Sequence, residues 1–552
     1  MRAIGPSRAY LVACFLTSLL IALYLAVVLP PLPTGKWVDY FHSLFFLQEP
    51  AAVVLCLAIL GLALAPSVRK TGTALVAWVG VNPGKASLAF FLLTAAGTLL
   101  VYRNYPLSPD EYVARFQSEA FAAGRLTGHM PVELLDWLVP RQRLFFPTSH
   151  TTGEVVSGYW PGHSLLLAPF TALGLPWVLN PLVGAGTVLL VHKVALELFQ
   201  DRWLAGLAAG LTMASTAVTV NAISYYSMPA HLALNLGWTI LVLRPSASRM
   251  LAGGLVGSLA LVLHNPVPHL LYAAPWGVWI LWRREHRRLV PWLAAGYLPG
   301  LFVGLAWAGL QARVGAGGFD PEWGAGKDAT SFWQGRAGRV FGLPTAEILE
   351  ARLLGLIKLW LWAVPGLPIL AVFGLRYLRR NPAMALLAAS AVTTLVGYLF
   401  VPASQGYGWG YRYFHSAWAT LPLLGLGLIA AERAPYPGDA RSRSILPGYV
   451  AGKVLLSVVL ATTLRFVQVA DYVGFRLRQA PSATSGVPQL VLIDTSIGYS
   501  TMDLVQNHPL LRRRPIYMES LGPERDHAMI RSRFPDLSLL HADKRGEVWG
   551  IP

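Results

Sequence analysis

The chain has 552 residues, of which 55% are hydrophobic and 13% are charged, and its mean hydropathy is +0.50. A water-soluble protein carries about 25% charged residues, so this composition excludes an ordinary soluble domain. The formal net charge is +17, but the basic residues gather in short segments between apolar stretches. That distribution indicates membrane topology and argues against nucleic acid as a partner.

Apolar stretches of about 17 residues or more recur along the chain, and each is long enough to cross ~30 Å of hydrocarbon as a helix. The two-residue alternation of a transmembrane β-barrel is absent. We therefore predict a polytopic α-helical membrane protein with about 13 transmembrane helices, surrounded by membrane lipids. The predicted spans lie at about 9–31, 45–65, 86–102, 176–198, 203–220, 229–243, 250–263, 267–282, 290–311, 353–375, 382–401, 416–431 and 446–465.

The basic residues predict how these spans are oriented. Arg2 and Arg8 precede the first span, and the basic run 283–288 separates the eighth span from the ninth. The positive-inside rule places both segments in the cytoplasm. We expect a multi-pass protein of the plasma (inner) membrane with a cytoplasmic N-terminus. Cys14 and Cys56 both fall within predicted spans, so no disulfide framework is expected.

Two long segments, 103–158 and 312–352, are predicted to lie outside, and loops of such length are usually functional. The second is interpreted either as a mobile lid or acceptor-binding loop, or as a solvated loop. Its basic and aromatic residues are Lys327, Arg336, Arg339, Trp323, Phe332 and Trp333. The apolar piece 163–174 is too short to cross alone, which indicates a re-entrant half-helix or the start of a broken span.

The tail 466–552 changes character, and it predicts a small extracytoplasmic α/β domain after a transmembrane domain of residues 1–465. Asp494 follows the first predicted strand, where it either marks a ligand crevice or begins a turn. The expected elements are strands at 489–493, 515–518 and 537–540, helices at 500–507 and 523–534, and an edge strand at 547–551.

Two adjacent acids, Asp110 and Glu111, follow the third predicted span. Ser108 as N-cap, Pro109 in the first helical position and Glu111 three residues after the cap match a capping box. A cap does not require an Asp beside the Glu, and the helix starts just outside a span. The pattern leaves both interpretations open, a helix cap or a pair of catalytic carboxylates.

Three further outward segments carry candidate binding residues. In 157–166 the chain re-enters the bilayer, and His163 there either contacts a polar substrate group or is an interfacial histidine beside a helix start. In 405–415 Arg412 lies among aromatic residues and glycines, which suits bidentate phosphate binding or an aromatic belt at a helix end. His264 and His269 flank another outward turn and could line the same cavity.

The acidic pair in the first large outward loop, followed by Tyr-Trp-Pro-Gly-His-Ser-Leu-Leu-Leu-Ala-Pro at 159–169, resembles the GT-C superfamily of membrane glycosyltransferases. The nearest likeness is to the bacterial branch related to aminoarabinose transferase and protein O-mannosyltransferases. The Gly-aromatic-Arg-Tyr segment before a late span also resembles this family. The resemblance covers most of 86–431.

This resemblance implies transfer of a sugar from a polyprenyl-phosphate donor to a glycan, lipid or protein acceptor at the outer face, with inversion. Asp110 would be the general base, and Glu111 would assist or bind the acceptor or a cation. Arg412 would bind the donor phosphate, while aromatic residues such as Tyr159 and Tyr411 stack on sugar or isoprenoid. The implied substrate-binding set is Tyr159, His163, His231, His264, Tyr411 and Arg412.

This sequence departs from the family in two respects. The acidic loop follows the third predicted span, whereas the family usually has it after the first. The next outward loop, 221–228, has no acid of the kind that some relatives carry, and His231 could stand in for it. A divalent cation therefore stays an open question.

The sequence contains no Lys-Ser/Thr phosphate loop, zinc-ligand spacing or nucleophile elbow. A transporter or flippase of a lipid-linked glycan is the alternative, because many spans and broken helices suit that role too. The clustering of candidate residues at the outer ends of spans favours chemistry at one face. A scaffold whose tail binds a partner is a third hypothesis.

Overall fold

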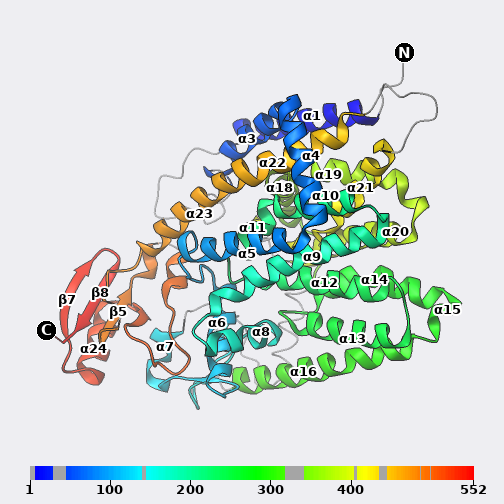
Figure 1. The fold of residues 1–552 in the computed structure, drawn as a ribbon. Coiled ribbons are helices and arrows are strands. Elements are labelled where there is room, and N and C mark those ends of the chain that lie inside the picture. Colours follow the sequence, from blue (N-terminus) through cyan, green and yellow to red (C-terminus); the bar gives the residue numbers. More distant parts are fainter. Residues whose placement is uncertain are drawn as a thin grey trace, which may run out of the picture.

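In a computed structural model, the structure describes residues 6–28, 45, 47–139, 145–316, 341–402, 407–433, 444–484, 486–497 and 499–551. Helices form most of the molecule, and a small sheet lies at one end (Figure 1). Their bounds are α1 Pro6–Val28, α3 Glu49–Leu62, α4 Pro66–Val81, α5 Pro83–Leu100, α6 Pro109–Ala122, α7 Leu135–Leu138, α8 Gly162–Ala172, α9 Leu179–Phe199, α10 Arg202–Met213, α11 Thr216–Ala222, α12 Met228–Val242, α13 Ala247–Val262, α14 Val267–Trp282, α15 Arg284–Arg287, α16 Val290–Ala316, α18 Ala346–Trp362, α19 Leu367–Gly374, α20 Pro382–Gly397, α21 Thr420–Arg433, α22 Leu446–Leu456, α23 Thr462–Leu477 and α24 Pro523–Arg533.

Six helices in the described part of the chain are long and apolar enough to cross a membrane, and counting each of three bent helix pairs as one span gives up to nine. The predicted number of about 13 stays a prediction. Two predicted spans, 203–220 and 353–375, are bent pairs, α10–α11 at 62° and α18–α19 at 99°. At the second bend, α18 ends at Trp362 with Ala363 extended, and Gly366, whose φ is 81°, is the N-cap from which α19 starts in a new direction.

Close helix packing in the bundle depends on small residues. A Cβ built at Gly254 of α13 would lie 2.7 Å from the Cα of Gly296 on α16. Only glycine at both positions allows these two backbones to approach so closely, which is a common device between membrane helices. Figure 1 shows α13 and α16 side by side along the lower edge of the bundle.

The tail forms a four-stranded sheet in the order β6-β5-β8-β7, in which β5 and β6 are parallel and β8 runs antiparallel to both of its neighbours. The strands are β5 Gln489–Ile493, β6 Ile516–Glu519, β7 Ser538–Asp543 and β8 Gly546–Gly550. The prediction of an edge strand at 547–551 is wrong, because β8 pairs on both sides. The alternating polar and apolar residues of β8 belong to a strand that forms a hairpin with β7, so they do not indicate a free edge.

The predicted helix at 500–507 is only a 3₁₀ turn over Tyr499–Leu504. The turn stops there because the backbone of Asn507 is used elsewhere. Its N–H donates to the hydroxyl oxygen of Tyr112 at 2.6 Å, and its carbonyl accepts from the same hydroxyl at 2.8 Å. A long-range contact therefore replaces the local helical hydrogen bonds.

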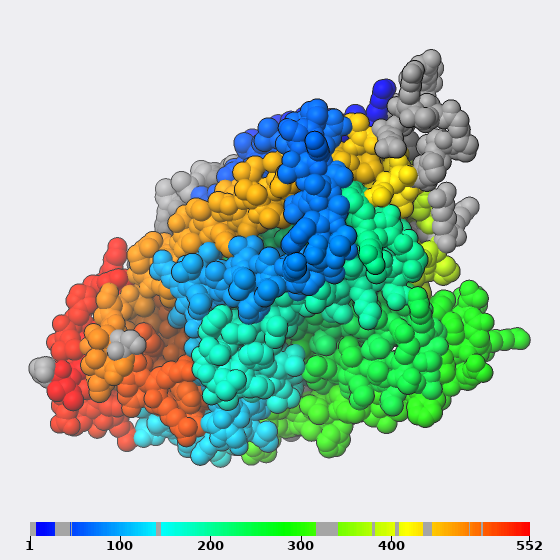
Figure 2. Space-filling view, viewed as in Figure 1, coloured from blue at the N-terminus to red at the C-terminus, as the bar shows by residue number. Residues whose placement is uncertain are grey.

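The sheet packs on the long loop 103–158, and the two share one hydrophobic cluster. Trp137 Nε1 donates to Asp526 Oδ1 at 2.8 Å, and Arg533 forms an ion pair with Glu133 at 3.2 Å. The last apolar helix continues from Leu446 to Leu477 and leads directly to the sheet (Figure 1). In the space-filling view, the orange and red tail lies against the cyan loop (Figure 2).

Candidate functional site

Asp110 is positioned by the first turn of α6. Ser108 has an extended backbone (φ −134°, ψ 161°), and Pro109 opens the helix. One oxygen of the Asp110 carboxylate accepts a hydrogen bond from the Tyr159 hydroxyl, and the other pairs with the guanidinium of Arg412. The side chains of Asp110 and Arg412 are each 15% exposed. The structure therefore brings three predicted site residues into one contact.

Burial opposes the charge on Asp110, but the nearby Arg412 and His264 and the hydrogen bond from Tyr159 outweigh it. The pKa of Asp110 is consequently lowered from its usual value. The carboxylate is thus ionised at neutral pH, and both of its oxygens are occupied. Each oxygen keeps a lone pair for an acceptor hydroxyl, but pairing with Arg412 lowers the basicity of the carboxylate, so loss of that contact would make Asp110 a better base.

Arg412 is presented by the hairpin of β3 Tyr407–Gly408 and β4 Gly410–Tyr411 and by the 3₁₀ turn Arg412–Ala417 that follows. Gly410 has φ 82° and would place a Cβ 2.8 Å from the Cβ of Ala217, so a larger residue does not fit. The guanidinium lies over the ring of Tyr226 at 4.4 Å. Tyr226, which the sequence analysis did not single out, fixes the plane of the cation.

Tyr411 points away from this contact. Its side chain is buried, and its ring packs on Gly355 of α18, where a built Cβ would meet it at 2.5 Å. The structure thus separates Tyr411 from Asp110 and gives it a packing role in positioning the hairpin.

Glu111 faces the protein interior and is fully buried. Its Oε1 accepts from the Tyr225 N–H at 2.8 Å, and its Oε2 accepts from the Leu107 N–H at 3.0 Å and the Tyr102 hydroxyl at 3.1 Å. Oε2 also accepts from the Ser108 hydroxyl at 3.3 Å. Burial raises the pKa of Glu111 to about 7, against these hydrogen bonds. The predicted capping box is not formed, because the Ser108 side chain donates to Glu111 and makes no cap, and Glu111 accepts from the Leu107 N–H instead. Asp110 pairs with a cation.

Tyr159 and His264 meet beside Asp110, with ring centroids 3.7 Å apart. Their chain segments are joined by two backbone hydrogen bonds, from Trp160 N–H to the His264 carbonyl at 2.9 Å and from His163 N–H to the Leu263 carbonyl at 2.8 Å. Burial lowers the pKa of His264 to about 4, although Asp110 acts in the opposite direction. His264 is therefore neutral at physiological pH.

His163 and His231 are both buried. His163 Nε2 lies 3.1 Å from the carbonyl oxygen of Tyr225. His231 lies on α12, directly after the loop that supplies Tyr225 and Tyr226. His269, in contrast, has both ring nitrogens paired, with Asn235 Oδ1 and the Tyr297 hydroxyl at 2.7 Å each.

A buried ionic triad lies behind the hairpin and was missed by the sequence analysis. Glu49 Oε1 is 2.8 Å from Lys358 Nζ, and Glu49 Oε2 is 2.6 Å from Arg465 Nη2. Lys358 also donates to the carbonyl of Gly408 at 3.3 Å. Single charges within apolar stretches signal such groups, but their pairing depends on three helices that are far apart in sequence.

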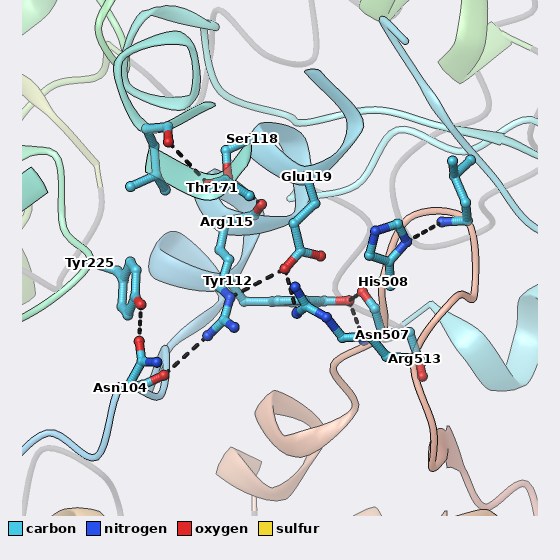
Figure 3. Close-up of polar contacts among 12 residues, drawn as sticks. Asn104, Tyr112, Arg115, Ser118, Glu119, Thr171, Tyr225, Asn507, His508 and Arg513 are labelled. Carbon is cyan, nitrogen blue, oxygen red and sulfur yellow. Dashed lines mark hydrogen bonds and ion pairs between the residues drawn. The ribbon is translucent and has the colours of Figure 1, made fainter. Parts of the chain in front are cut away.

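A second missed feature is the clamp between α6 and the tail. Glu119 pairs with Arg115 at 3.3 Å and with Arg513 at 2.6 Å, while Tyr112 holds Asn507. Figure 3 shows these side chains of α6 facing the tail segment that carries Asn507 and Arg513. The clamp fixes the helix on which Asp110 lies.

In this structure Asp110 is paired with Arg412 and Glu111 accepts four hydrogen bonds, so neither acid presents a free carboxylate to a divalent cation. Within the described ranges, no group of three His, Cys, Asp or Glu side chains is arranged to hold a metal ion. The lid candidates fall outside the described residues: Lys327, Arg336, Arg339, Trp323, Phe332 and Trp333.

The fold resembles that of ArnT from Cupriavidus metallidurans, a GT-C aminoarabinose transferase. The apo structure of ArnT matches with a TM-score of 0.51 and 14% identity, over 85% of this chain and 98% of ArnT. The structure of ArnT bound to undecaprenyl phosphate matches with a TM-score of 0.49 and 16% identity, over 84% of this chain and 97% of ArnT. No protein-family model and no curated protein matches the sequence. The expected helical, GT-C-like fold with a small C-terminal sheet region is confirmed.

Proposed function

We propose that the protein transfers a sugar from a polyprenyl-phosphate-linked donor to a glycan, lipid or protein acceptor. The observation that carries this proposal is the contact between the Asp110 carboxylate and the Arg412 guanidinium. A carboxylate and a cation at one point supply the two groups that such a transfer needs, a proton acceptor and a phosphate ligand. The GT-C-like fold supports the reaction class.

In this proposal, the donor phosphate competes with Asp110 for Arg412. A phosphodiester offers the planar guanidinium two oxygens, so it can replace the carboxylate as bidentate partner. Asp110 is then left with Tyr159 and one free oxygen. That oxygen accepts the proton of the acceptor hydroxyl as the hydroxyl oxygen bonds to the anomeric carbon, and the lipid phosphate leaves with the electrons of the broken C–O bond. A single displacement of this kind inverts the anomeric configuration.

Arg412 and the Tyr226 ring beneath it stay in place during the exchange, because the Gly410 turn and the Asn221 amide hold the hairpin. Asn221 Nδ2 donates to the Trp409 carbonyl at 2.7 Å. Arg412 is therefore already in place before the donor binds, whereas Asp110 loses its contact with Arg412 when the donor phosphate binds.

The reaction is tested with the full chain reconstituted into proteoliposomes and a panel of synthetic undecaprenyl-phosphate-linked hexoses, pentoses and amino sugars. Transfer, or hydrolysis in the absence of acceptor, should release undecaprenyl phosphate from at least one donor. The Asp110→Asn variant should release it about 10²–10⁴-fold more slowly while it remains folded. Unchanged turnover by Asp110→Asn would remove the assigned role of Asp110.

We also propose that the site and the tail lie on the extracytoplasmic side of the inner membrane, on the basis of the positive-inside pattern. His541 on β7 has a side chain that is 51% exposed, so a His541→Cys substitution gives an accessible thiol. The two native cysteines are buried. A membrane-impermeant maleimide should label His541→Cys in intact spheroplasts, and labelling only after lysis would reverse the orientation.

Lipid-linked glycan transport is a second candidate, favoured by the buried triad of Glu49, Lys358 and Arg465. Ionisable groups inside a helical bundle often lie on a transport path. The same proteoliposomes distinguish the two functions, because a flippase moves an intact donor between leaflets without releasing undecaprenyl phosphate.

A further inference from the structure

Several buried polar atoms in segments around His264, the histidine beside Asp110, have no hydrogen-bond partner in the described part of the chain. They belong to three separate segments, the start of α8, the first turn of α12 and the 3₁₀ turn after Arg412. The atoms are His163 Nδ1, His231 Nδ1 and Nε2, His415 Nε2 and Ser416 Oγ. Buried polar groups almost always have a partner, so this concentration points to a missing polar ligand.

The packing of α12 brings these residues together. Asn235, one helical turn after His231 and on the same face, donates to the Ser416 carbonyl at 3.0 Å and pairs with His269 at 2.7 Å. His231 therefore faces the 3₁₀ turn and the start of α14. It is within electrostatic range of His163, His264, His269 and His415. We call the group of His163, His231, His415 and Ser416 the histidine cluster.

The histidine cluster adjoins the candidate site through His264. The ring of His264 contacts Tyr159, and it interacts electrostatically with Asp110, Arg412 and His163. His269 shows what a packing histidine looks like in this bundle, because both of its ring nitrogens are paired. His231 lies on the same side of the bundle and has neither nitrogen paired.

The donors and acceptors of the cluster restrict the chemistry of the ligand. His163 Nε2 faces the Tyr225 carbonyl and must carry the proton, so Nδ1 offers a lone pair only. A ligand at Nδ1 must therefore donate a hydrogen bond. A phosphodiester has no proton to donate, whereas a hydroxyl group donates one hydrogen bond and accepts others. In a neutral His231 one ring nitrogen donates and the other accepts, so its ligand must offer both an acceptor and a donor.

We propose that the histidine cluster binds the hydroxyl groups of the transferred sugar ring, with His231 as the central contact. This inference rests on the proposed function and deepens it. The cluster would supply the selectivity for a polyhydroxylated ring, while Arg412 binds the phosphate without regard to the sugar. The two parts of the donor are thus recognised by different residues of one site.

The experiment compares binding of two probes to the purified full chain in detergent: bare undecaprenyl phosphate and the panel of undecaprenyl-phosphate-linked sugars. At least one sugar-linked lipid should bind more tightly than the bare lipid. His231→Leu should lower that affinity by about tenfold and leave the affinity for undecaprenyl phosphate within about twofold. His231→Gln, which keeps a donor and an acceptor, should retain part of the preference. Arg412→Ala should weaken both probes.

His192→Leu serves as the matched control, because His192 Nε2 has its own partner in the Gly80 carbonyl at 3.2 Å. Thermal unfolding establishes that each variant is folded, and His231→Gln provides the measurement if His231→Leu is not. The inference is overturned if every sugar-linked lipid binds only as tightly as the bare lipid, or if His231→Leu and His231→Gln both leave the preference intact. Binding of neither probe by the unmodified chain would instead overturn the proposed function.

Discussion

The carboxylate of Asp110 and the guanidinium of Arg412 are in direct contact, although 302 positions of sequence separate them. Removing the charge of Asp110 should have two opposite effects. Transfer by Asp110→Asn should fall by about 10²–10⁴-fold, because the proton acceptor is lost. Its affinity for undecaprenyl phosphate should rise, because Arg412 no longer has a competing carboxylate.

Turnover and lipid binding are measured on the same preparation of Asp110→Asn. Asp494→Asn is the matched control, because the Asp494 carboxylate accepts the Ser496 N–H at 2.8 Å in the turn after β5. Weaker lipid binding by Asp110→Asn would show that the carboxylate supports the phosphate site rather than competing for it.

Arg412→Lys tests whether the planar guanidinium is needed. Lysine keeps the charge but loses the two-pronged geometry and the stacking on Tyr226, so the Kd for undecaprenyl phosphate should rise about tenfold or more. Isothermal titration or scintillation proximity binding gives this value. An affinity equal to that of the unmodified chain would mean that a point charge is sufficient there.

Glu49→Gln should destabilise the protein by about 3–5 kcal/mol, because it leaves the buried cations Lys358 and Arg465 without their anion. The effect should reach the site as well, since Lys358 holds the Gly408 carbonyl of the hairpin. Thermal unfolding in detergent measures the loss. Glu285→Gln, at an exposed side chain, should leave the melting temperature unchanged.

Glu111 should make stability depend on pH. Its folded-state pKa of about 7 is above the ordinary value of 4.5, so the folded protein binds this proton more tightly than the unfolded chain does. The stabilisation is complete below pH 4.5 and is lost as the pH rises to about 7, a change of about 3 kcal/mol. Glu111→Gln should flatten this part of the plot of melting temperature against pH, and an equally steep plot would contradict the assignment.

Tyr112→Phe should loosen the clamp between α6 and the tail, because the Asn507 N–H and carbonyl both lose their partner. The expected cost is about 1–3 kcal/mol. Limited proteolysis should cut the tail of the variant sooner than that of the unmodified chain. Tyr24→Phe, on α1, is the comparison, and equal cleavage rates for the two variants would argue against the clamp.

The helical membrane fold could be predicted from the sequence because apolar length and basic loops carry that information locally. Asp110, Tyr159, His264 and Arg412 could also be named, since each lies in a short segment whose polarity or glycine content stands out between spans. What could not be predicted was their pairing. The contact of Asp110 with Arg412 depends on how α6 and the hairpin pack, which no local pattern records.

The errors have physical causes of the same kind. The segment 500–507 was predicted as a helix, but only Tyr499–Leu504 forms a 3₁₀ turn, because the backbone of Asn507 pairs with Tyr112, 395 positions away. β8 was predicted as an edge although the strand at 537–540 was expected, because the order of strands in a sheet depends on pairing with β5, which is distant in sequence. The triad of Glu49, Lys358 and Arg465 was missed because each residue is a single charge in an apolar segment, and nothing in that segment shows which residue it pairs with.

The clamp on α6 has a consequence for how the protein is made. Asn507 follows Tyr112 by 395 residues, so at ribosomal speed roughly 20–80 s pass between the appearance of the two halves of this contact. During that interval the nascent chain has its acidic helix but lacks the segment that secures it. A chain released before Asn507 is made would therefore lack the contact that holds α6.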